Sequence, residues 1–287
     1  MKRIWVNGLL AVSVAGLVMF AGSFVYALAD EALAGNNPSA EERVGGALPE
    51  RQFAMQPMAI GDNDGDANAE TAEDGTVQLL GLGDSLTSGM GSSDGEGYLR
   101  YVEESFFESN DLELTVTNAA VDGHRTEDVL RDIEQADLNG QVRAADVIVM
   151  TIGGNDLFQG GQSLLNDDPE LNEDALDDFL VNLDDLYDEL IELNPEARVY
   201  HIGIYNPFRE FGLSAADDQF VREWNYATLE SAAEYDQVTY VPVEDMFEED
   251  VGAYLSGDFF HLNDDGYQRV ADRLMTTLRW PEEEETS

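Results

Sequence analysis

The sequence predicts an α/β protein built on a doubly wound, parallel β-sheet. From residue 76 onward, short apolar segments alternate with longer segments whose apolar residues recur at helical spacing, which is the pattern of repeated strand–helix–strand units. Residues 147–152 (Val-Ile-Val-Met-Thr-Ile) are almost continuously apolar, as expected of a strand that helices cover on both faces. With 287 residues, of which 43% are hydrophobic, the chain is long enough for one such domain with extensions.

Five short segments are predicted as the strands of this sheet. The first is apolar enough to be buried, and it leads directly into Gly-Asp-Ser-Leu at residues 83–86. The others alternate with the helical segments along the chain. The predicted strands are residues 77–82, 112–118, 147–152, 199–204 and 238–243.

The helices are predicted from apolar spacing together with start and stop signals. Thr126 is suited to cap the second helix, and Asn139-Gly140 is predicted to end it. The long third helix places acids opposite its apolar face and ends at Asn194-Pro195, whereas Asn263 is a good cap for the last helix. The predicted helices are residues 98–108, 126–138, 176–191, a segment around 220–224, and 263–278.

A serine at the carboxyl end of a strand is the first functional signal. Ser85 lies where open α/β sheets place their sites, although a lone serine there is also a common helix N-cap. A serine hydroxyl is a poor nucleophile until a base takes its proton. His261 is the candidate base, and Asp258, three residues earlier, can orient its ring and stabilise its cation. His201 lies in a predicted strand and is interpreted as structural, and His124 is assigned no chemistry.

Four segments together resemble the SGNH hydrolases, the GDSL esterase/lipase superfamily. In chain order they are Gly-Asp-Ser-Leu (83–86), Asn-Ala-Ala-Val-Asp-Gly (118–123), Gly-Gly-Asn-Asp (153–156) and Asp-Phe-Phe-His (258–261). The resemblance covers roughly residues 76–280. It implies a flavodoxin-like doubly wound sheet of about five parallel strands with helices on both faces, a three-layer α/β/α fold.

The resemblance also implies an oxyanion hole. Its donors fall on the backbone N–H of Ser85, the backbone N–H of Gly123 and the side chain of Asn155. Each fits physically, because glycine lets an N–H approach a substrate closely and Asn155 follows the third strand at the carboxyl edge. The neighbouring Asp84 and Asp156 are interpreted as hydrogen-bond acceptors that brace the loops.

The function expected from these residues is that of an exported serine ester hydrolase acting through an acyl-enzyme on Ser85. The expected substrate is a small lipid, aryl or carbohydrate acyl ester, with no cofactor and no metal, and the expected state is a monomer. The alternative is a non-catalytic cell-surface binding module on the same fold; the presence of Ser85, Asn155, Asp258 and His261 argues against it. A nucleotide-binding loop is disfavoured because Leu86 replaces the third glycine of its motif, and no histidine pair has metal-ligand spacing.

Residues 157–173, directly after the predicted oxyanion donor, lack a regular apolar pattern. They are predicted either to border and partly cover the acyl pocket or to be a surface excursion that leads into the long helix. The sequence leaves both open.

The first 75 residues predict export and a linker. Lys2-Arg3 precede an uncharged run, residues 4–29, that ends in Ala-Leu-Ala. Residues 1–29 are therefore a cleaved signal peptide or an N-terminal membrane anchor, since the run is long enough to span a bilayer. Either places the domain, residues 76–287, outside the cytoplasm. Residues 30–75 are predicted as an acidic flexible linker, and the calcium-loop-like spacing at residues 62–73 lacks the required glycine.

The charge of the chain is extreme. The sequence has 60 acidic residues against 14 basic ones, a net charge of −46, and from residue 76 onward we count 49 acids and 10 arginines. Nucleic acid is disfavoured as a partner because phosphate binding needs clustered cations. Such a surface is typical of proteins adapted to high salt, where self-repulsion is screened, although an alkaline habitat would look similar. The chain has no cysteine and hence no disulfide.

Overall fold

The computed structural model describes residues 76–109, 112–135, 138–158, 169–209 and 215–281. The predicted signal or anchor, the linker and the calcium-like loop lie outside the described residues, and so do residues 159–168 of the segment predicted to cover the pocket. Within the described ranges, no helix has both the length and the apolar character needed to cross a membrane.

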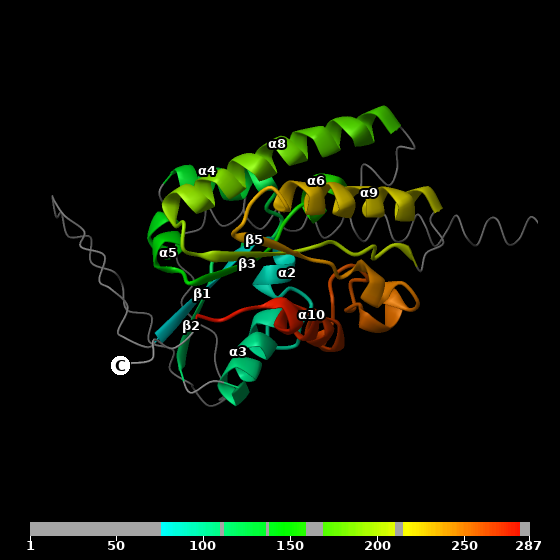
Figure 1. Ribbon diagram of the computed structural model, residues 1–287. Helices are drawn as coiled ribbons and strands as arrows, with labels where there is room; N and C mark the ends of the chain where they lie inside the picture. Colours follow the sequence, from blue (N-terminus) through cyan, green and yellow to red (C-terminus); the bar gives the residue numbers. More distant parts are fainter. Residues whose placement is uncertain (1–75, 110–111, 136–137, 159–168, 210–214, 282–287) are drawn as a thin grey trace, which may run out of the picture. The chain divides into compact units, whose positions relative to one another are not determined.

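The described residues form one parallel sheet of five strands in the order β2-β1-β3-β4-β5 (Figure 1). This confirms the predicted α/β class. The chain runs from β1 outward to β2 and then crosses back to β3, so the direction of winding changes between β1 and β3, where open α/β sheets bind ligands. The strands are β1 (Thr76–Gly83), β2 (Glu113–Asn118), β3 (Val147–Thr151), β4 (Arg198–Ile202) and β5 (Val238–Val241).

Helices cover both faces of the sheet and give the predicted three layers (Figure 1). One face carries α4 (Thr126–Glu134), α5 (Asn139–Ala144), α8 (Pro169–Leu193) and α9 (Ala215–Ala232). The other face carries α3 (Gly97–Ser109) and α10 (Asp264–Thr277). Shorter elements follow strands at the carboxyl edge: α2 (Ser85–Ser88), α6 (Gly154–Phe158), and the 3₁₀ turns η3 (Glu244–Phe247) and η4 (Val251–Tyr254).

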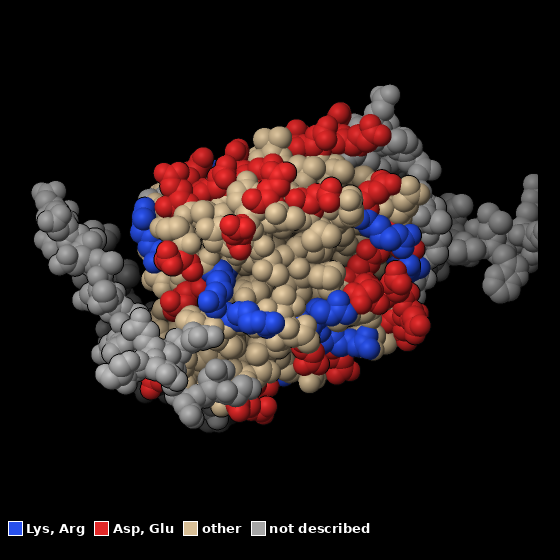
Figure 2. Space-filling view, viewed as in Figure 1, with Lys and Arg blue, Asp and Glu red and all other residues tan. Residues whose placement is uncertain are grey.

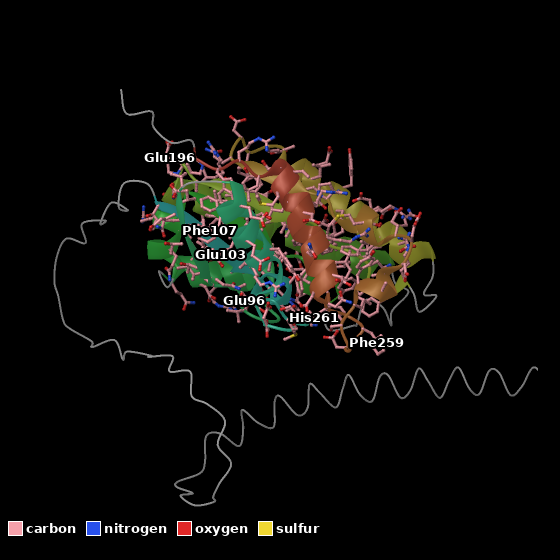
Figure 3. The ribbon with its side chains drawn as sticks, turned by 90° about the horizontal axis from the view of Figure 1, so that it is seen from below. Glu96, Glu103, Phe107, Glu196, Phe259 and His261 are labelled. Carbon is pink, nitrogen blue, oxygen red and sulfur yellow. The ribbon has the colours of Figure 1, made fainter. Side chains whose placement is uncertain are left out.

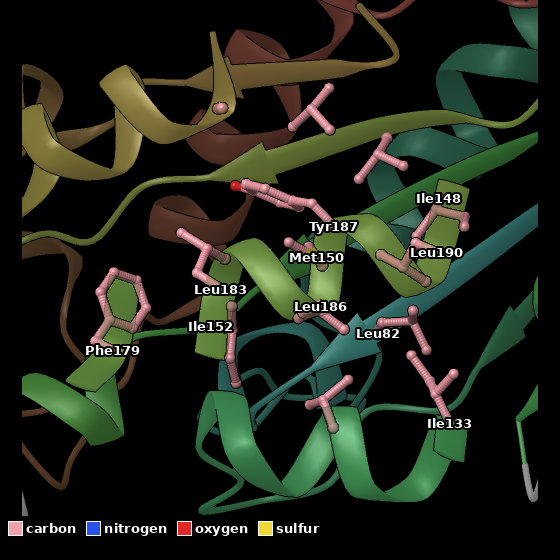
Figure 4. Close-up of a cluster of buried hydrophobic side chains, with 14 of the residues drawn as sticks. Leu82, Ile133, Ile148, Met150, Ile152, Phe179, Leu183, Leu186, Tyr187 and Leu190 are labelled. Carbon is pink, nitrogen blue, oxygen red and sulfur yellow. The ribbon is translucent and has the colours of Figure 1, made fainter. Parts of the chain in front are cut away.

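The strands divide their side chains between two core clusters because successive residues of a strand point to opposite faces. On β3, Ile148 and Met150 pack under α8, whereas Val147 and Val149 pack under α3 and α10. Figure 4 shows the first cluster, in which the leucines of α8 lie over these strand residues. The acidic face of α8 points to solvent, and acidic side chains crowd along it in Figure 2.

Two of the predicted helix start and stop signals were wrong, and α8 begins at Pro169 instead of the predicted residue 176, so residues 169–173 are helical. Thr126 is the first residue of α4 and not its cap; Arg125 holds the cap position, and its N–H donates to the Asp128 carboxylate at 3.0 Å. Asn139-Gly140 begins α5 instead of ending α4, because Gly140 does not adopt the positive φ of a helix-ending glycine. The predicted cap at Asn263 is confirmed by its acceptance of the Gly266 N–H at 3.0 Å.

Candidate active site

The turn between β1 and α2 presents Ser85 at the carboxyl edge of the sheet. Gly83 has φ +109°, and a Cβ there would lie 1.9 Å from the carbonyl oxygen of Thr151, so only glycine fits. Asp84 is the N-cap of α2, and its backbone N–H donates to the same carbonyl at 3.0 Å. The turn is therefore fastened to the end of β3, and Ser85 is 7% exposed.

Ser85, His261 and Asp258 are brought together from sequence positions 176 residues apart. His261 Nε2 lies 2.9 Å from Ser85 Oγ, and His261 Nδ1 lies 2.6 Å from Asp258 Oδ2. Because an ionised carboxylate only accepts hydrogen bonds, the Nδ1–H donates to Asp258 and Nε2 is left to accept from the serine hydroxyl. Figure 3 shows His261 and Phe259 together at one edge of the domain, on the side away from Glu196, which precedes β4.

The Asp258 carboxylate is held as an anion. Partial burial raises its pKa, but the hydrogen bond with His261 and those from the backbone N–H of Phe260 and the Ser256 hydroxyl lower it more, so its pKa lies well below the ordinary value of 3.8. The backbone N–H of His261 also donates to this carboxylate, at 3.0 Å. Four donors thus fix the group that orients the imidazole.

Behind Ser85, a buried chain of hydroxyl groups ends on Asp84. Its Oδ1 accepts from Leu86 N–H at 3.1 Å and from Thr151 Oγ1 at 2.6 Å. Thr151 Oγ1 lies 2.8 Å from Thr87 Oγ1, which lies 2.7 Å from the Tyr98 hydroxyl. When Asp84 is ionised it can only accept, so each hydroxyl donates toward it: Tyr98 to Thr87, Thr87 to Thr151, and Thr151 to Asp84. Asp84 and these three hydroxyl groups join the turn after β1 to α2, β3 and α3.

The segments of the three predicted oxyanion donors are tied down by neighbouring polar groups. Asn155, on α6, donates one N–H to the His124 carbonyl at 2.9 Å, which leaves its second N–H available. The Asp156 carboxylate accepts from the Thr126 N–H at 3.2 Å, which fastens α6 to the beginning of α4, and Gly123 lies just before it with φ +80°.

The backbone N–H groups of Ser85 and Gly123 donate to no acceptor within the described part of the chain. No hydrogen bond or shared cavity there joins Gly123 to Ser85, so its place in the oxyanion hole stays a prediction.

Asp84 and Asp156 brace these loops, as the sequence suggested, and both are unusual acids. Burial raises the pKa of Asp84 to about 6, although the hydrogen bonds from Thr151 and Leu86 oppose this shift. Burial likewise raises the pKa of Asp156 to about 6, against the hydrogen bonding from Thr126. The fold therefore disfavours the ionised form of both carboxyl groups.

The side chains of the other two histidines contact none of Ser85, Asp258 and His261 within the described residues. His201 is buried in β4, where the Tyr187 hydroxyl lies 2.6 Å from its Nδ1 and the Ile152 carbonyl 3.2 Å from its Nε2. Desolvation lowers the pKa of His201 to about 4, so it is neutral and structural. His124 Nδ1 faces Asp132 at 3.7 Å.

A small cavity of about 30 Å³ opens beside Ser85. Most of its walls were not predicted, because they come from separate loops that the sequence gives no reason to combine. Three phenylalanine rings form a cluster at this cavity: the centroid of Phe158 lies 5.4 Å from that of Phe208 and 6.0 Å from that of Phe260. The cavity is lined by Asp84, Ser85, Leu86, Gly154, Asn155, Phe158, Ile204, Tyr205, Pro207 and Phe260. In the described ranges, no group of three or more histidine, aspartate or glutamate side chains is arranged to hold a metal ion.

Comparisons with known proteins agree with the four sequence motifs. A model of the GDSL-like lipase/acylhydrolase family matches residues 82–269. The chain is 30% identical over 216 residues to the uncharacterized protein YpmR of Bacillus subtilis, covering 73% of this chain and 84% of that protein. It is 27% identical over 207 residues to the spore germination lipase LipC of Bacillus licheniformis, covering 69% and 95%. Among solved structures, the lipase Lip_vut3 from a goat rumen metagenome aligns with a TM-score of 0.63 at 25% identity, covering 70% of this chain and 96% of that one.

Proposed function

Because the chain belongs to the GDSL-like lipase/acylhydrolase family, we propose that it is an exported serine ester hydrolase in which Ser85 forms an acyl-enzyme. One observation carries the proposal. A single imidazole, that of His261, lies 2.9 Å from the serine hydroxyl on one side and 2.6 Å from the Asp258 carboxylate on the other. This is the arrangement that a hydroxyl nucleophile requires.

In the first half of the reaction, Ser85 Oγ attacks the carbonyl carbon of the ester. The new O–C bond forms as His261 Nε2 takes the hydroxyl proton, and the carbonyl π electrons move onto oxygen. When this intermediate collapses, the bond to the alcohol oxygen breaks, and His261 returns the proton to that oxygen. The alcohol leaves, and the acyl group stays on Ser85.

In the second half, water replaces the alcohol. His261 takes one proton from the water as its oxygen bonds to the acyl carbon, and then gives that proton to Ser85 Oγ as the acyl–serine bond breaks. The products are a carboxylic acid and the free enzyme. Asp258 holds the imidazole in the required tautomer and stabilises its cation in both halves.

The negative charge on the carbonyl oxygen needs donors that are already in place. The unpaired N–H of Ser85 and the second N–H of the Asn155 amide lie beside the cavity, and Gly123 completes the set that the family resemblance implies. The removal of one such donor costs about 100- to 1000-fold in turnover in serine hydrolases of known mechanism.

The test is the substitution Ser85→Ala in the full chain. The variant should hydrolyse no p-nitrophenyl acetate above the buffer rate and should keep the melting temperature of the wild type, since only one hydroxyl is removed from a turn held by other bonds. Hydrolysis at the wild-type rate would refute the mechanism and favour a non-catalytic binding module.

Export is part of the proposal and rests on residues 1–29. The basic start, the uncharged run and the Ala-Leu-Ala sequence support it. The amino-terminal sequence of the protein recovered from its native host tests it: a chain that begins at Asp30 indicates a cleaved signal, a chain that retains residues 4–29 in the membrane fraction indicates an anchor, and an intact chain in the cytoplasm refutes export.

A further inference from the structure

We propose that this enzyme acts on esters of short acyl groups, from acetyl to about butyryl, and that Gly154 and Phe158 set this limit. The inference rests on the proposed function, because it concerns the group that Ser85 would carry. Beyond that function, Gly154 and Phe158 would select short acyl esters as the substrate class.

The positions of Ser85, Asn155 and His261 determine which part of the ester enters the cavity. Ser85 and Asn155 both line it, so a carbonyl group bound between them lies at its mouth. The alcohol oxygen must be within reach of His261, since this residue protonates it as it leaves. His261 does not line the cavity. The alcohol therefore departs on the His261 side, and the acyl group occupies the cavity.

The size of the cavity limits the acyl group. A volume of about 30 Å³ holds about two or three water-sized groups, at roughly 10–15 Å³ for each. A methyl or methylene group is of similar size to water, so the cavity takes an acyl chain with about one to three carbons beyond the carbonyl. A longer chain would have to displace a wall or leave the cavity.

The walls are fixed by packing. Phe158 is 8% exposed and Ile204 is 6% exposed, so neither is free to move aside. The rings of Phe208 and Phe260 pack edge-on against Phe158. The Tyr205 hydroxyl donates to the Phe260 carbonyl at 2.6 Å and so ties the loop after β4 to the loop that carries His261.

Gly154 gives the cavity its width. A Cβ built on this residue would lie 3.8 Å from Asp84 Oδ2 and 3.9 Å from Ile204 Cγ2, which are ordinary van der Waals distances. Gly154 does not have a positive φ. An alanine would therefore fit without strain and would place its methyl group in the space that the acyl chain needs.

The experiment compares kcat/KM for p-nitrophenyl acetate, butyrate, hexanoate and octanoate, each below its solubility limit, with the full chain. The wild type should prefer acetate and butyrate over octanoate by about 10-fold or more, since one methylene that a pocket cannot accept costs at least about 10-fold. Gly154→Ala should lower the butyrate-to-acetate ratio by about 10-fold. Phe158→Leu should raise the hexanoate-to-butyrate ratio by a similar factor.

The matched control is Phe106→Leu, which makes the same change at a fully buried ring in the other core cluster. It should change the melting temperature and leave the chain-length ratios as they are. Ratios taken within one variant do not depend on how much of it folds.

Three results would overturn the inference. Ser85-dependent hydrolysis that is fastest on octanoate, or ratios that neither Gly154→Ala nor Phe158→Leu changes, would overturn it while leaving the proposed function in place. Absence of Ser85-dependent hydrolysis at every chain length would overturn the proposed function and the acyl limit together.

Discussion

Replacing Asp84 by asparagine should stabilise the protein increasingly as the pH rises. Asparagine keeps an oxygen that can accept from Leu86 N–H and Thr151 Oγ1, the two groups that Oδ1 of Asp84 now serves. The change removes the ionisation and little else. Because burial raises the pKa of Asp84 in the fold, its charged form is what the fold disfavours.

The magnitude follows from the two pKa values. The ordinary pKa of the group is 3.8, and in the fold it is about 6. At about 1.36 kcal/mol per pKa unit, ionisation of Asp84 costs about 3 kcal/mol of folding free energy. A group whose pKa is raised in the fold contributes stability that is fully present below its ordinary pKa. This stability is lost as the pH rises from the ordinary pKa through the pKa of the folded state. The cost therefore develops mostly between about pH 4 and about pH 6.

The assay is denaturant unfolding of the wild type and of Asp84→Asn across this range. The difference in unfolding free energy between the two should grow by about 3 kcal/mol from about pH 4 to about pH 8. Any pH-independent effect of the substitution cancels in this comparison. Asp258→Asn is the control: the pKa of Asp258 is lowered, so the stability that its carboxylate adds is already fully present above the ordinary pKa of 3.8, and the difference between the wild type and this variant should stay nearly constant from about pH 4 to about pH 8. A difference for Asp84→Asn that does not change with pH would refute the reasoning.

Three further predictions concern the same site and the surface. Asp258→Asn should lower kcat for a p-nitrophenyl ester by up to about 10,000-fold, because His261 would no longer be held in the tautomer that accepts a proton; a loss under tenfold would contradict this role. Thr151→Val should move the loss of unfolding free energy that accompanies Asp84 ionisation to higher pH, because it removes a donor that lowers the pKa of Asp84, whereas Thr151→Ser keeps the hydroxyl and should restore the wild-type dependence of unfolding free energy on pH. The melting temperature should rise steeply from about 0.1 M to molar sodium chloride, because the Debye length falls from about 10 Å to about 3 Å around a chain of net charge −46; a salt-independent melting temperature would show that the charge is balanced locally.

The sheet could be predicted from the sequence because its strands are buried on both faces. Where strands and helices alternate along a chain, a short and continuously apolar segment such as Val147–Thr151 predicts a strand that helices cover on both faces. The short helices α2 and α6 were not predicted, since four or five residues are too few to show helical periodicity. The cap at Thr126 was misplaced because the Asp128 carboxylate receives the N–H of Arg125, a bond that depends on side-chain geometry.

Some residues of the candidate site could likewise be predicted from the sequence, and others could not. Ser85, Asp258 and His261 could be proposed because each stands in a short motif, and the fold brings them within hydrogen-bond distance. The hydroxyl chain behind Ser85 could not, because threonine and tyrosine side chains give no sign in sequence of which way they point. Phe158 and Ile204 were also missed, since an apolar residue after a strand fits a core position as well as a cavity wall.

The buried acids explain how such a charged chain keeps a defined site. Asp84 holds the N-terminus of α2, where Ser85 lies, and Asp156 holds the N-terminus of α4, next to Gly123. Both give up stability when they ionise, yet each serves backbone donors that would otherwise be buried without a partner. Dissolved salt screens exposed charges much more than buried ones. Salt should therefore act on the stability of the domain through its surface, while the positions of the predicted oxyanion donors depend on buried hydrogen bonds that dissolved salt screens much less.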